Sequence, residues 1–385
     1  MTGSMLVIDT VYPRALSAIF AQCSASNNSY DDALRCMFSA KFGMSDTYEK
    51  FFNDQGWACS TVIANSTALQ TLWARENISQ ISVTAALVKQ SALGRVPLIR
   101  NLPLERPLLD KILIAQIRSI APEVVFCFDL SYMSDAVLQT ARRNGCLIVG
   151  QTNSSLPPDR HLVKFDLLVS SFPFFIDHFD DLGISTLQLD LGFDDRVPVR
   201  GVSETRDIKV SFVGGITRVH QRSAILQTLL TVDPNASFFG YIDDDVKLPA
   251  EVQARHFGER WGNEAYAVLN SSAVTVNEHG SVDPHLRLGG VRTAGNMRLF
   301  EATGCGALLV TDDVPRIDDF FDVGREILTF GDLGELNECV QWALDNPDEA
   351  ARMASRAQAR TLRDHTYTAR LPALRQRLEA EIGRR

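Results

Sequence analysis

The sequence predicts an α/β protein with two parallel sheets, each covered by helices on both faces. Short apolar runs alternate with longer amphipathic runs along the chain, which is the pattern of parallel βαβ units. The apolar runs are nearly continuous in Val, Ile, Leu and Phe, as expected for strands buried on both faces. A polar segment in mid-chain separates two such series, so we expect two domains.

In the first series the expected strands are residues 5–9, 59–64, 123–129, 146–152, 165–171 and 185–190. The amphipathic runs between them predict helices at residues 66–76, 108–120 and 135–145. The last of these helices ends in a glycine, a usual C-terminal residue. In the second series we expect strands at residues 208–215, 236–241, 273–280, 306–313 and 326–330.

The segment GFDDRVPVRGVSETRD, residues 192–207, is polar, contains proline and lacks an apolar period. We therefore predict an N-terminal Rossmann-like domain at 1–193 and a C-terminal one at 207–365. A final amphipathic helix at 366–385 either packs back on the N-terminal domain or only caps the second half. Ligands of such sheets bind at the carboxyl ends of the strands.

Composition excludes several classes of protein. A chain of 385 residues with 45% hydrophobic content can bury a large core, and a net charge of −9 argues against a general nucleic-acid binder. Seven irregularly spaced cysteines predict reduced thiols rather than disulfides or a zinc site. We find no signal-peptide pattern and no apolar run long enough to span a bilayer. These features predict a soluble cytoplasmic protein, and they leave peripheral membrane contact open.

The stretch GNMRLFEATGCGALLVTDD, residues 295–313, is the most informative. It predicts a helix at 296–303 that leads through a glycine turn into a buried strand. Gly295 and Asn296 leave backbone N–H groups at the helix start, where the helix dipole favours a phosphate. Glu301, just over one turn further, is placed to accept bonds from the hydroxyls of a ribose. The alternative is that Glu301 is a solvated helix residue.

The second half resembles GT-B glycosyltransferases, and is most similar to the spore-maturation CgeB-like group. The resemblance covers about residues 207–370 and rests on RLGGVRTAGNMRLFEATGCGALLVTDDVPRIDDFF, GREILTFGDLGELNECVQWALDNPDEA, HTYTAR and SFVGGITRVHQR. It implies two Rossmann-like domains facing a central cleft, with the donor nucleotide sugar on the second. In the family a glutamate at the place of Glu301 binds the donor ribose. Many retaining members carry a second glutamate eight positions earlier, where this chain has Thr293, so the stereochemical outcome stays open.

Further donor-binding candidates lie at strand ends of the second half. The Gly-Gly turn at the end of the strand expected at residues 208–215 is followed by cations, which suits a diphosphate leaving group without a metal. For each cation the alternative is an ordinary surface residue, and for the histidine near the end of the strand expected at residues 273–280 it is a structural role. The candidates are Gly214, Gly215, Arg218, His220, Arg222, Asn277, His279 and Arg292.

The first half is expected to hold the acceptor. Asp9 ends the first strand and could act as general base on an acceptor hydroxyl, with Tyr12 and Arg14 beside it in the following loop. The alternative is that Asp9 caps the next helix. Asp243 and Asp245 form an Asp-x-Asp pair, which in GT-A glycosyltransferases binds manganese. The two αβ series and the Glu301 helix favour GT-B, so we expect neither a metal nor another cofactor.

Together these features predict a metal-independent glycosyltransferase of bacterial glycan biosynthesis. It would move a sugar from a nucleotide-diphosphate donor to the hydroxyl of a glycan, lipid-linked or protein acceptor. Two alternatives share the donor site: a nucleotide-sugar epimerase that needs no acceptor, and a catalytically silent nucleotide-sugar-binding or scaffold protein. A dehydrogenase is disfavoured because no GxGxxG motif follows a predicted strand.

Overall fold

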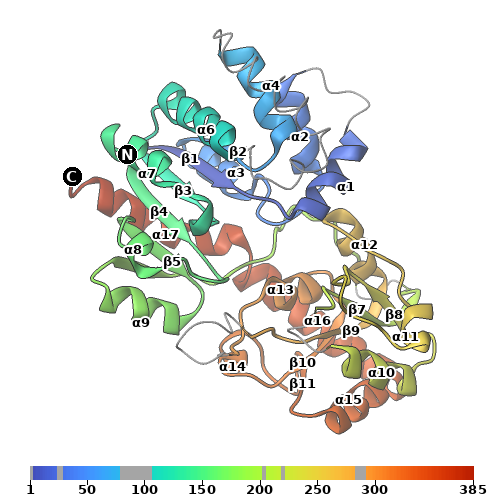
Figure 1. Cartoon of the computed structure of the whole chain (residues 1–385). Coiled ribbons are helices and arrows are strands. Elements are labelled where there is room, and N and C mark those ends of the chain that lie inside the picture. The colour runs from blue at the N-terminus through green and yellow to red at the C-terminus, as the bar shows by residue number, and fades with distance from the viewer. Residues whose placement is uncertain (1–2, 24–28, 79–105, 202–204, 218–221, 282–291) are drawn as a thin grey trace. The chain divides into compact units, whose positions relative to one another are not determined.

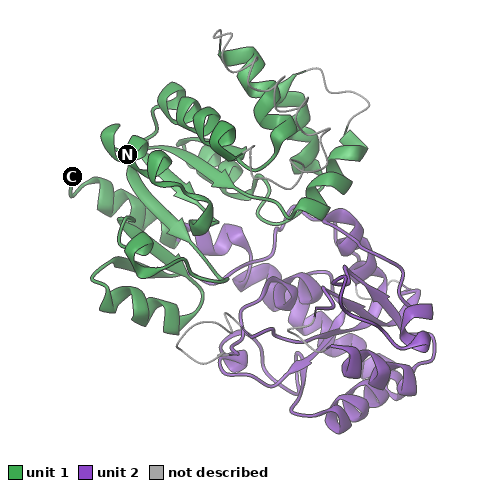
Figure 2. Ribbon diagram, viewed as in Figure 1, with its two compact units in different colours: residues 1–188, 373–385 green, residues 189–372 purple. Residues whose placement is uncertain are grey.

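The computed structural model describes residues 3–23, 29–78, 106–201, 205–217, 222–281 and 292–385 (Figure 1). The chain forms two compact units (Figure 2). Unit 1 comprises Met1–Gln188 and Ala373–Arg385, and unit 2 comprises Leu189–Pro372. Each unit contains one parallel sheet with helices around it, as the alternation of apolar and amphipathic runs predicts.

The sheet of unit 1 has the strand order β2-β1-β3-β4-β5-β6. Its strands are β1 (Ser4–Asp9), β2 (Ala58–Ile63), β3 (Val124–Cys127), β4 (Leu147–Gln151), β5 (Leu167–Ser170) and β6 (Ser185–Gln188). Its helices include α1 (Pro13–Cys23), α2 (Tyr30–Ser39), α3 (Thr47–Asp54), α4 (Thr67–Asn77), α6 (Arg106–Ile120), η1 (Leu130–Tyr132), α7 (Asp135–Arg143), α8 (Asp159–Leu162) and α9 (Pro173–Asp181). Every strand predicted for the first half is present.

The sheet of unit 2 has the order β11-β10-β9-β7-β8. Its strands are β7 (Ile208–Val213), β8 (Ser237–Phe239), β9 (Ser272–Asn277), β10 (Leu308–Asp312) and β11 (Leu328–Phe330). The helices are α10 (Ser223–Val232), α11 (Ala250–Ala254), α12 (Asn263–Ser271), α13 (Met297–Gly304), α14 (Ile317–Phe320), α15 (Leu333–Asp345), α16 (Pro347–Asp364) and α17 (Tyr367–Ile382). The strands predicted for the second half are likewise confirmed.

Burial explains why these sequences form strands. Every residue of β3, β4, β5 and β10 is buried, because helices cover both faces of a parallel sheet. β6 lies at an edge and is only half-buried, which fits its more polar sequence STLQ. Side-chain caps define the helix starts: Ser66 accepts a bond from the backbone N–H of Leu69, and Ser134 does so from Val137. Gly145, with φ 76°, follows α7 as predicted.

The polar mid-chain segment does not run free between the units. Phe193 exchanges backbone hydrogen bonds with His365 and Tyr367, at 2.8 and 3.0 Å. The Arg200 backbone N–H donates to Asn270 Oδ1 at 3.0 Å. Residues from Leu189 on therefore belong to unit 2, although composition alone reads them as a linker. The sequence pattern missed this packing because backbone pairing to distant residues leaves no local apolar period.

α17 begins in unit 2, but its residues from Ala373 on belong to unit 1. Arg375 Nη1 donates to Gln55 Oε1 at 2.8 Å, and Arg385 Nη2 lies 2.7 Å from Asp166 Oδ2. The end of the chain thus contacts elements of the first half of the sequence.

The prediction that all cysteines are reduced thiols is wrong for two of them. Cys23 and Cys36 form a disulfide that joins α1 to α2, with their Cα atoms 5.7 Å apart. Their spacing matches no disulfide or metal motif, so only the packing of the two helices reveals the pair. Cys59, Cys127, Cys146, Cys305 and Cys339 are free, as expected. Within the described part of the chain, no helix combines the length and apolar character needed to cross a membrane.

Candidate functional site

A partly buried polar cluster lies at the carboxyl edge of the unit 2 sheet. β9 is flanked by β7 and β10, and the register places Asn277 beside Thr311. The ends of three neighbouring strands and the start of α13 therefore meet at one edge, where parallel sheets bind ligands. The cluster comprises Arg222, Asn277, Glu278, His279, Arg292, Asn296, Thr311 and Asp312.

Asp312 is the centre of the cluster. Its Oδ1 accepts the backbone N–H of His279 at 2.9 Å and lies 2.7 Å from His279 Nδ1, and its Oδ2 pairs with Arg292 Nη2. Burial by itself would raise the pKa of Asp312, but the bonds from His279 and the charge of Arg292 outweigh it and lower that pKa. Asp312 is therefore ionised. His279 Nε2 is buried and has no hydrogen-bond partner among the described residues.

Arg222 ties the β7–α10 turn to the end of β9. Its Nη1 donates to Gly215 O at 2.6 Å, its Nη2 to Glu278 O at 2.8 Å, and its Nε to Glu278 Oε2 at 3.3 Å. Burial lowers the pKa of Arg222, although the Glu278 carboxylate acts against this. Burial raises the pKa of Glu278. Only 12% of the Arg222 side chain is exposed, so this guanidinium acts first as a structural clamp. The surface-cation alternative does not hold for Arg222.

Asn277 connects the strand edge to α13. Its Nδ2 donates to Thr311 Oγ1 at 2.9 Å, and its Oδ1 accepts from Asn296 Nδ2 at 3.1 Å. Asn296 in turn caps α13 by accepting the Leu299 N–H at 3.1 Å. Gly295, directly before the cap, has φ 130°, a conformation that favours glycine. The predicted helix is thus present, and its start is held against the polar cluster.

Glu301 is not a solvated helix residue, since only 13% of its side chain is exposed. Its Oε2 lies 2.8 Å from Arg298 Nη1, and Tyr266 of α12 donates its hydroxyl to Oε1 at 3.3 Å. Both carboxylate oxygens therefore have partners within unit 2. A ribose bound here would share Glu301 with Tyr266 or displace its hydroxyl, so the ribose contact stays a prediction.

The glycine turn after β7 has a packing role. The Gly214 N–H already donates to Phe239 O at 2.9 Å and is not available to a phosphate. A Cβ on Gly215 would lie 2.4 Å from the ring of Tyr241, so any larger residue here would have to displace that ring. Arg218 and His220 lie outside the described residues. The donor-binding role of this turn remains a prediction.

At the carboxyl edge of the unit 1 sheet, Asp9 is the last residue of β1 and is 8% exposed. Its Oδ1 accepts the Thr10 N–H at 2.8 Å, before α1 begins, which does not support the alternative that it caps that helix. Burial raises the pKa of Asp9 to about 7; the Thr10 bond opposes this and the nearby Asp129 carboxylate adds to it. A carboxyl group with this pKa is suited to take up a proton near neutral pH.

The two other acceptor-side candidates are exposed. Tyr12 is 66% exposed, and its ring meets that of Phe42 edge-on with centroids 6.0 Å apart. Arg14 is exposed on the first turn of α1. Burial and, after it, the charge of Asp9 raise the pKa of Tyr12, so these two side chains interact. The acceptor-side roles of Tyr12 and Arg14 stay predictions.

Five residues of these sites were not among the candidates of the sequence analysis: Glu278, Thr311, Asp312, Arg298 and Tyr266. Asp312 was detectable, because it ends a predicted buried strand next to the one that ends in Asn277. Arg298 stands one helical turn before Glu301, which is also a usable signal. Tyr266 was not detectable, since only the packing of α12 against α13 brings it to Glu301.

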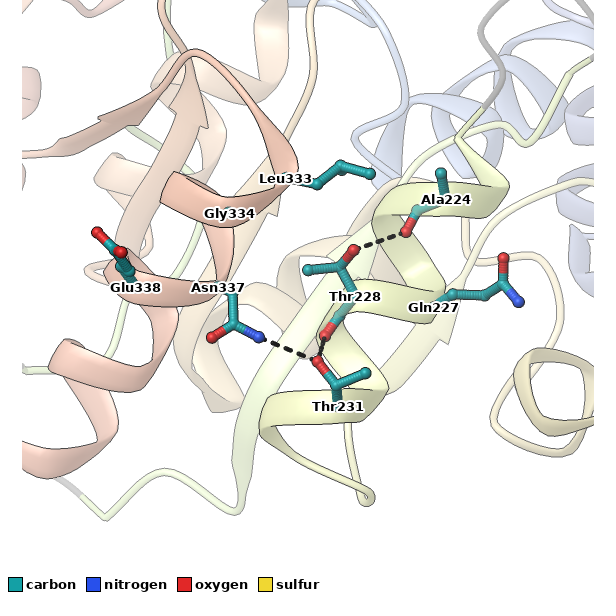
Figure 3. Close-up of a pocket in the computed structure, with 8 residues that line it drawn as sticks. All are labelled: Ala224, Gln227, Thr228, Thr231, Leu333, Gly334, Asn337 and Glu338. Carbon is teal, nitrogen blue, oxygen red and sulfur yellow. Dashed lines mark hydrogen bonds between the residues drawn. The ribbon is translucent and has the colours of Figure 1, made fainter.

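The described part of the chain contains no metal site of three or more ligands, and a hollow in unit 2 contains none of the predicted donor or acceptor residues. Among the described residues, no group of three or more His, Cys, Asp and Glu side chains is arranged to hold a metal ion. That the pair Asp243 and Asp245 binds no metal stays a prediction. A hollow of about 700 Å³ lies between α10 and α15; Figure 3 shows the residues that line it. It is lined by Ala224, Gln227, Thr228, Thr231, Leu333, Gly334, Asn337 and Glu338.

Comparisons with known proteins agree with this fold. Residues 224–376 match the model of a family described as glycosyl transferase-like. No curated protein sequence matches the chain. Among solved structures, Anabaena Alr3699/HepE in complex with UDP-glucose is similar at 12% identity over 98% of this chain and 99% of that one, with a TM-score of 0.55.

Two further structures are similar over nearly their whole length. Sucrose-phosphate synthase (tll1590) from Thermosynechococcus elongatus shares 13% identity over 98% of this chain and 100% of that one, with a TM-score of 0.58. A glycosyltransferase from Rickettsia africae shares 8% identity over 99% and 98%, with a TM-score of 0.53. The chain therefore has the GT-B fold, two Rossmann-like α/β domains, as predicted. Its second half carries the glycosyl transferase-like match, whereas the similarity to the CgeB-like group stays a prediction.

Proposed function

We propose that this protein is a GT-B glycosyltransferase that moves a sugar from a nucleotide-diphosphate donor to an acceptor hydroxyl. The observation that carries the proposal is the partly buried cluster around Asp312, which holds two arginines and the start of α13 at the carboxyl edge of the unit 2 sheet. Apart from Arg222, the cluster lies within residues 224–376, the glycosyl transferase-like match. HepE, of similar fold, has been crystallised with UDP-glucose.

The cluster suggests different roles for its two arginines. Arg222 donates to Gly215 and Glu278 and is nearly buried, so it positions the turn. Arg292 is 44% exposed and pairs with the carboxylate of Asp312, with Glu278 Oε1 at 3.8 Å. A donor diphosphate would compete with these carboxylates for Arg292. We therefore assign Arg292, rather than Arg222, to the negative charge that develops on the leaving group.

On the acceptor side we assign Asp9 as general base. In the transfer step the acceptor oxygen forms a bond to the anomeric carbon, and the bond from that carbon to the diphosphate breaks. The electron pair leaves with the nucleoside diphosphate, and the acceptor proton passes to Asp9. A base with a pKa of about 7 is half ionised near neutral pH, so it is ready to accept this proton.

The proposal includes no metal and no other cofactor. An excess of chelator should leave the transfer rate unchanged, measured with the donor saturating. Strict dependence on manganese, together with loss of activity in Asp243→Ala, would instead assign the chemistry to an Asp-x-Asp metal site.

One experiment separates the proposed function from its alternatives. The full chain is first screened for thermal stabilisation by nucleotide sugars; a ligand at about 100 times its Kd should stabilise by about 2.7 kcal/mol. The stabilising donor is then incubated with and without candidate acceptors, and the products are identified by mass and chromatography. A transferase forms a glycoside only with acceptor. An epimerase converts the donor alone, and a silent binding protein shows binding without product.

We place this reaction in bacterial glycan biosynthesis, on the cytoplasmic side, with peripheral membrane contact allowed if the acceptor is lipid-linked. The disulfide between Cys23 and Cys36 is of a kind that is rare in the cytosol. Thiol quantification on protein isolated from its native host under acid quench tests this placement: seven free thiols would support the cytoplasm, whereas five free thiols and the disulfide of the structure would argue for an oxidising compartment.

A further inference from the structure

A small cavity beside Asp9 has a chemical character that limits what the acceptor is. It lies within unit 1, between the carboxyl ends of β1 and β2, the helices α1 and α2, and the loop that follows α2. Its volume of about 10 Å³ has room for roughly one water molecule, which is also the size of one hydroxyl group. Its lining is Asp9, Val11, Ile19, Met37, Phe38, Phe42, Ser45 and Ile63.

The lining offers a ligand one carboxylate, that of Asp9, and one hydroxyl, that of Ser45. Six of its side chains are apolar, and the hydroxyl of Ser45 donates to the backbone oxygen of Phe38 at 2.9 Å. Asp9 keeps one oxygen for the Thr10 N–H. A sugar with one hydroxyl in this space would have to lay its other hydroxyls against the apolar side chains around it, and each hydroxyl that loses its partners there costs binding about tenfold. An apolar ligand with a single hydroxyl avoids this cost, because that hydroxyl can bond to Asp9.

The disulfide between Cys23 and Cys36 holds α1 and α2 together, and these helices form one wall of the cavity. Ile19 lies one helical turn before Cys23, and Met37 follows Cys36, so the disulfide joins the two helices next to the residues that line the cavity. On the other side, the loop between α2 and α3 has φ values of 56° at Lys41, 63° at Gly43 and 50° at Ser45. Such conformations in non-glycine residues are held by their surroundings and gather at ligand-binding positions.

An aromatic pair borders this cavity. Phe42 lines the cavity and is half-buried, and its ring contacts that of Tyr12, which is 66% exposed. Val11, the neighbour of Tyr12, also lines the cavity. Two aromatic rings beside a hydroxyl-sized space provide an apolar surface for the part of a ligand that stays outside it.

We propose that the cavity beside Asp9 receives the reacting hydroxyl of an acceptor whose adjoining body is apolar, an alkyl or aryl alcohol rather than a sugar. This inference rests on the proposed function and names the substrate class of its acceptor side. Asp9 accepts the hydroxyl proton, and the side chains of Val11, Ile19 and Phe42 contact the carbon next to the hydroxyl.

The test is a homologous series of primary alcohols, from 1-propanol to 1-hexanol, titrated by calorimetry into the full chain without donor. Burial of each added methylene should tighten binding about fourfold until the apolar surface is filled. Glycerol and methyl glucoside should not bind at the same concentrations. The same alcohols should yield alkyl glycosides when donor is added.

Three variants make the test specific. Ile19→Phe fills the cavity and should abolish alcohol binding, whereas Ile19→Leu, of equal volume, should retain it. Phe174→Ala removes a half-buried ring from α9, in the same unit but outside the cavity, and should bind as wild type does. Circular dichroism melting of each variant identifies any that fail to fold. If Ile19→Phe does not fold, loss of binding in Phe42→Ala with retention in Phe174→Ala serves in its place.

The outcomes separate this inference from the proposed function. An affinity that does not change along the series, or binding that survives in Ile19→Phe, overturns the apolar acceptor. Efficient transfer to a sugar with no alcohol bound overturns it as well, while the glycosyltransferase stands. Alcohol binding in a protein that neither binds nor turns over any nucleotide sugar supports the apolar site and overturns the proposed function.

Discussion

Asp9 and Asp312 occupy equivalent places in the two sheets and behave in opposite ways. Each is the last residue of a buried parallel strand, and they are 8% and 4% exposed. Burial raises the pKa of Asp9 to about 7, whereas the pKa of Asp312 is lowered despite burial. The difference lies in their partners, since Asp312 has His279 and Arg292 while Asp9 has one backbone N–H and the like charge of Asp129. The same position in the fold thus serves as a proton acceptor in one unit and as an anchor for cations in the other.

The largest effect is expected for Asp9→Asn. If Asp9 takes the acceptor proton, its loss should lower kcat about 10²- to 10⁴-fold. Donor affinity should stay unchanged, because the donor contacts are assigned to unit 2. Steady-state kinetics and donor titration on the same preparation check both. A variant with wild-type kcat would mean that the raised pKa of Asp9 serves no proton transfer.

The stability of Asp9→Asn should reveal the cost of the buried charge. The folded-state pKa of Asp9 is above its unfolded value, so the folded protein binds more protons between pH 4 and 7 and loses stability as the pH rises through this window. Asn has no charge to bury. The variant should equal wild type near pH 4 and exceed it by up to about 4 kcal/mol at pH 8.

Urea unfolding at both pH values measures the difference. An identical pH dependence in the two proteins would show that Asp9 is not the group that titrates, and would remove the contrast with Asp312.

Asp312→Asn should show the opposite sign. The folded-state pKa of Asp312 is lowered, so its contribution to stability is present above the unfolded pKa and is lost as the pH falls through the folded one. Replacement removes a carboxylate that is bonded twice to His279 and paired with Arg292, which keeps only Glu278 Oε1 at 3.8 Å, and should destabilise by roughly 3 kcal/mol at pH 7.

The matched control for Asp312→Asn is Asp313→Asn, an exposed neighbour outside the cluster, which should stay within about 0.5 kcal/mol of wild type. Equal losses in the two variants would show that the cluster contributes no specific stability.

Glu301→Ala should give the smallest of these effects. Loss of bonds to a donor ribose removes roughly 1.5–3 kcal/mol, so donor affinity should fall about one to two orders of magnitude. A 2′,3′-dideoxynucleotide donor should bind weakly to wild type and little worse to the variant. Calorimetric titration with both nucleotides measures this, and equal losses for the two would place the role of Glu301 elsewhere.

Tyr266→Phe is the control for Glu301→Ala, because it removes the hydroxyl at 3.3 Å from Glu301 and keeps the carboxylate. It should leave ribose binding intact. The pairing of Glu301 with Arg298 also means that some stability is lost with the carboxylate, so melting curves of Glu301→Ala are needed beside the titrations.

Much of the fold was predictable because its signals are local. Strands buried on both faces require continuous apolar runs, and each predicted run is a strand. The helix with Glu301 was expected at residues 296–303 and is found at Met297–Gly304 with Asn296 as its cap. Asp9, Asn277 and His279 were identified because packing alone rarely accounts for a polar residue at the end of a buried strand or just after it.

The disulfide and the packing of residues 189–200 on unit 2 were not predictable, as both depend on segments brought together from elsewhere in the chain. The same holds for the partners of the site residues. Asp312 stands 33 positions from His279, and Tyr266 stands 35 from Glu301. The periodicity of apolar residues within a helix or strand carries no information about contacts between residues so far apart in the chain.

The sequence by itself determined that two series of buried parallel strands exist and that polar residues end several of them. Apolar runs and helix caps depend on residues that are close together in the chain, so they can be predicted from the order of the residues. The tertiary structure decided what each of those polar residues can do. Whether a buried carboxyl such as Asp9 or Asp312 is protonated near pH 7 depends on the charges and donors that packing brings within hydrogen-bond distance, and electrostatic interactions act through space rather than along the chain.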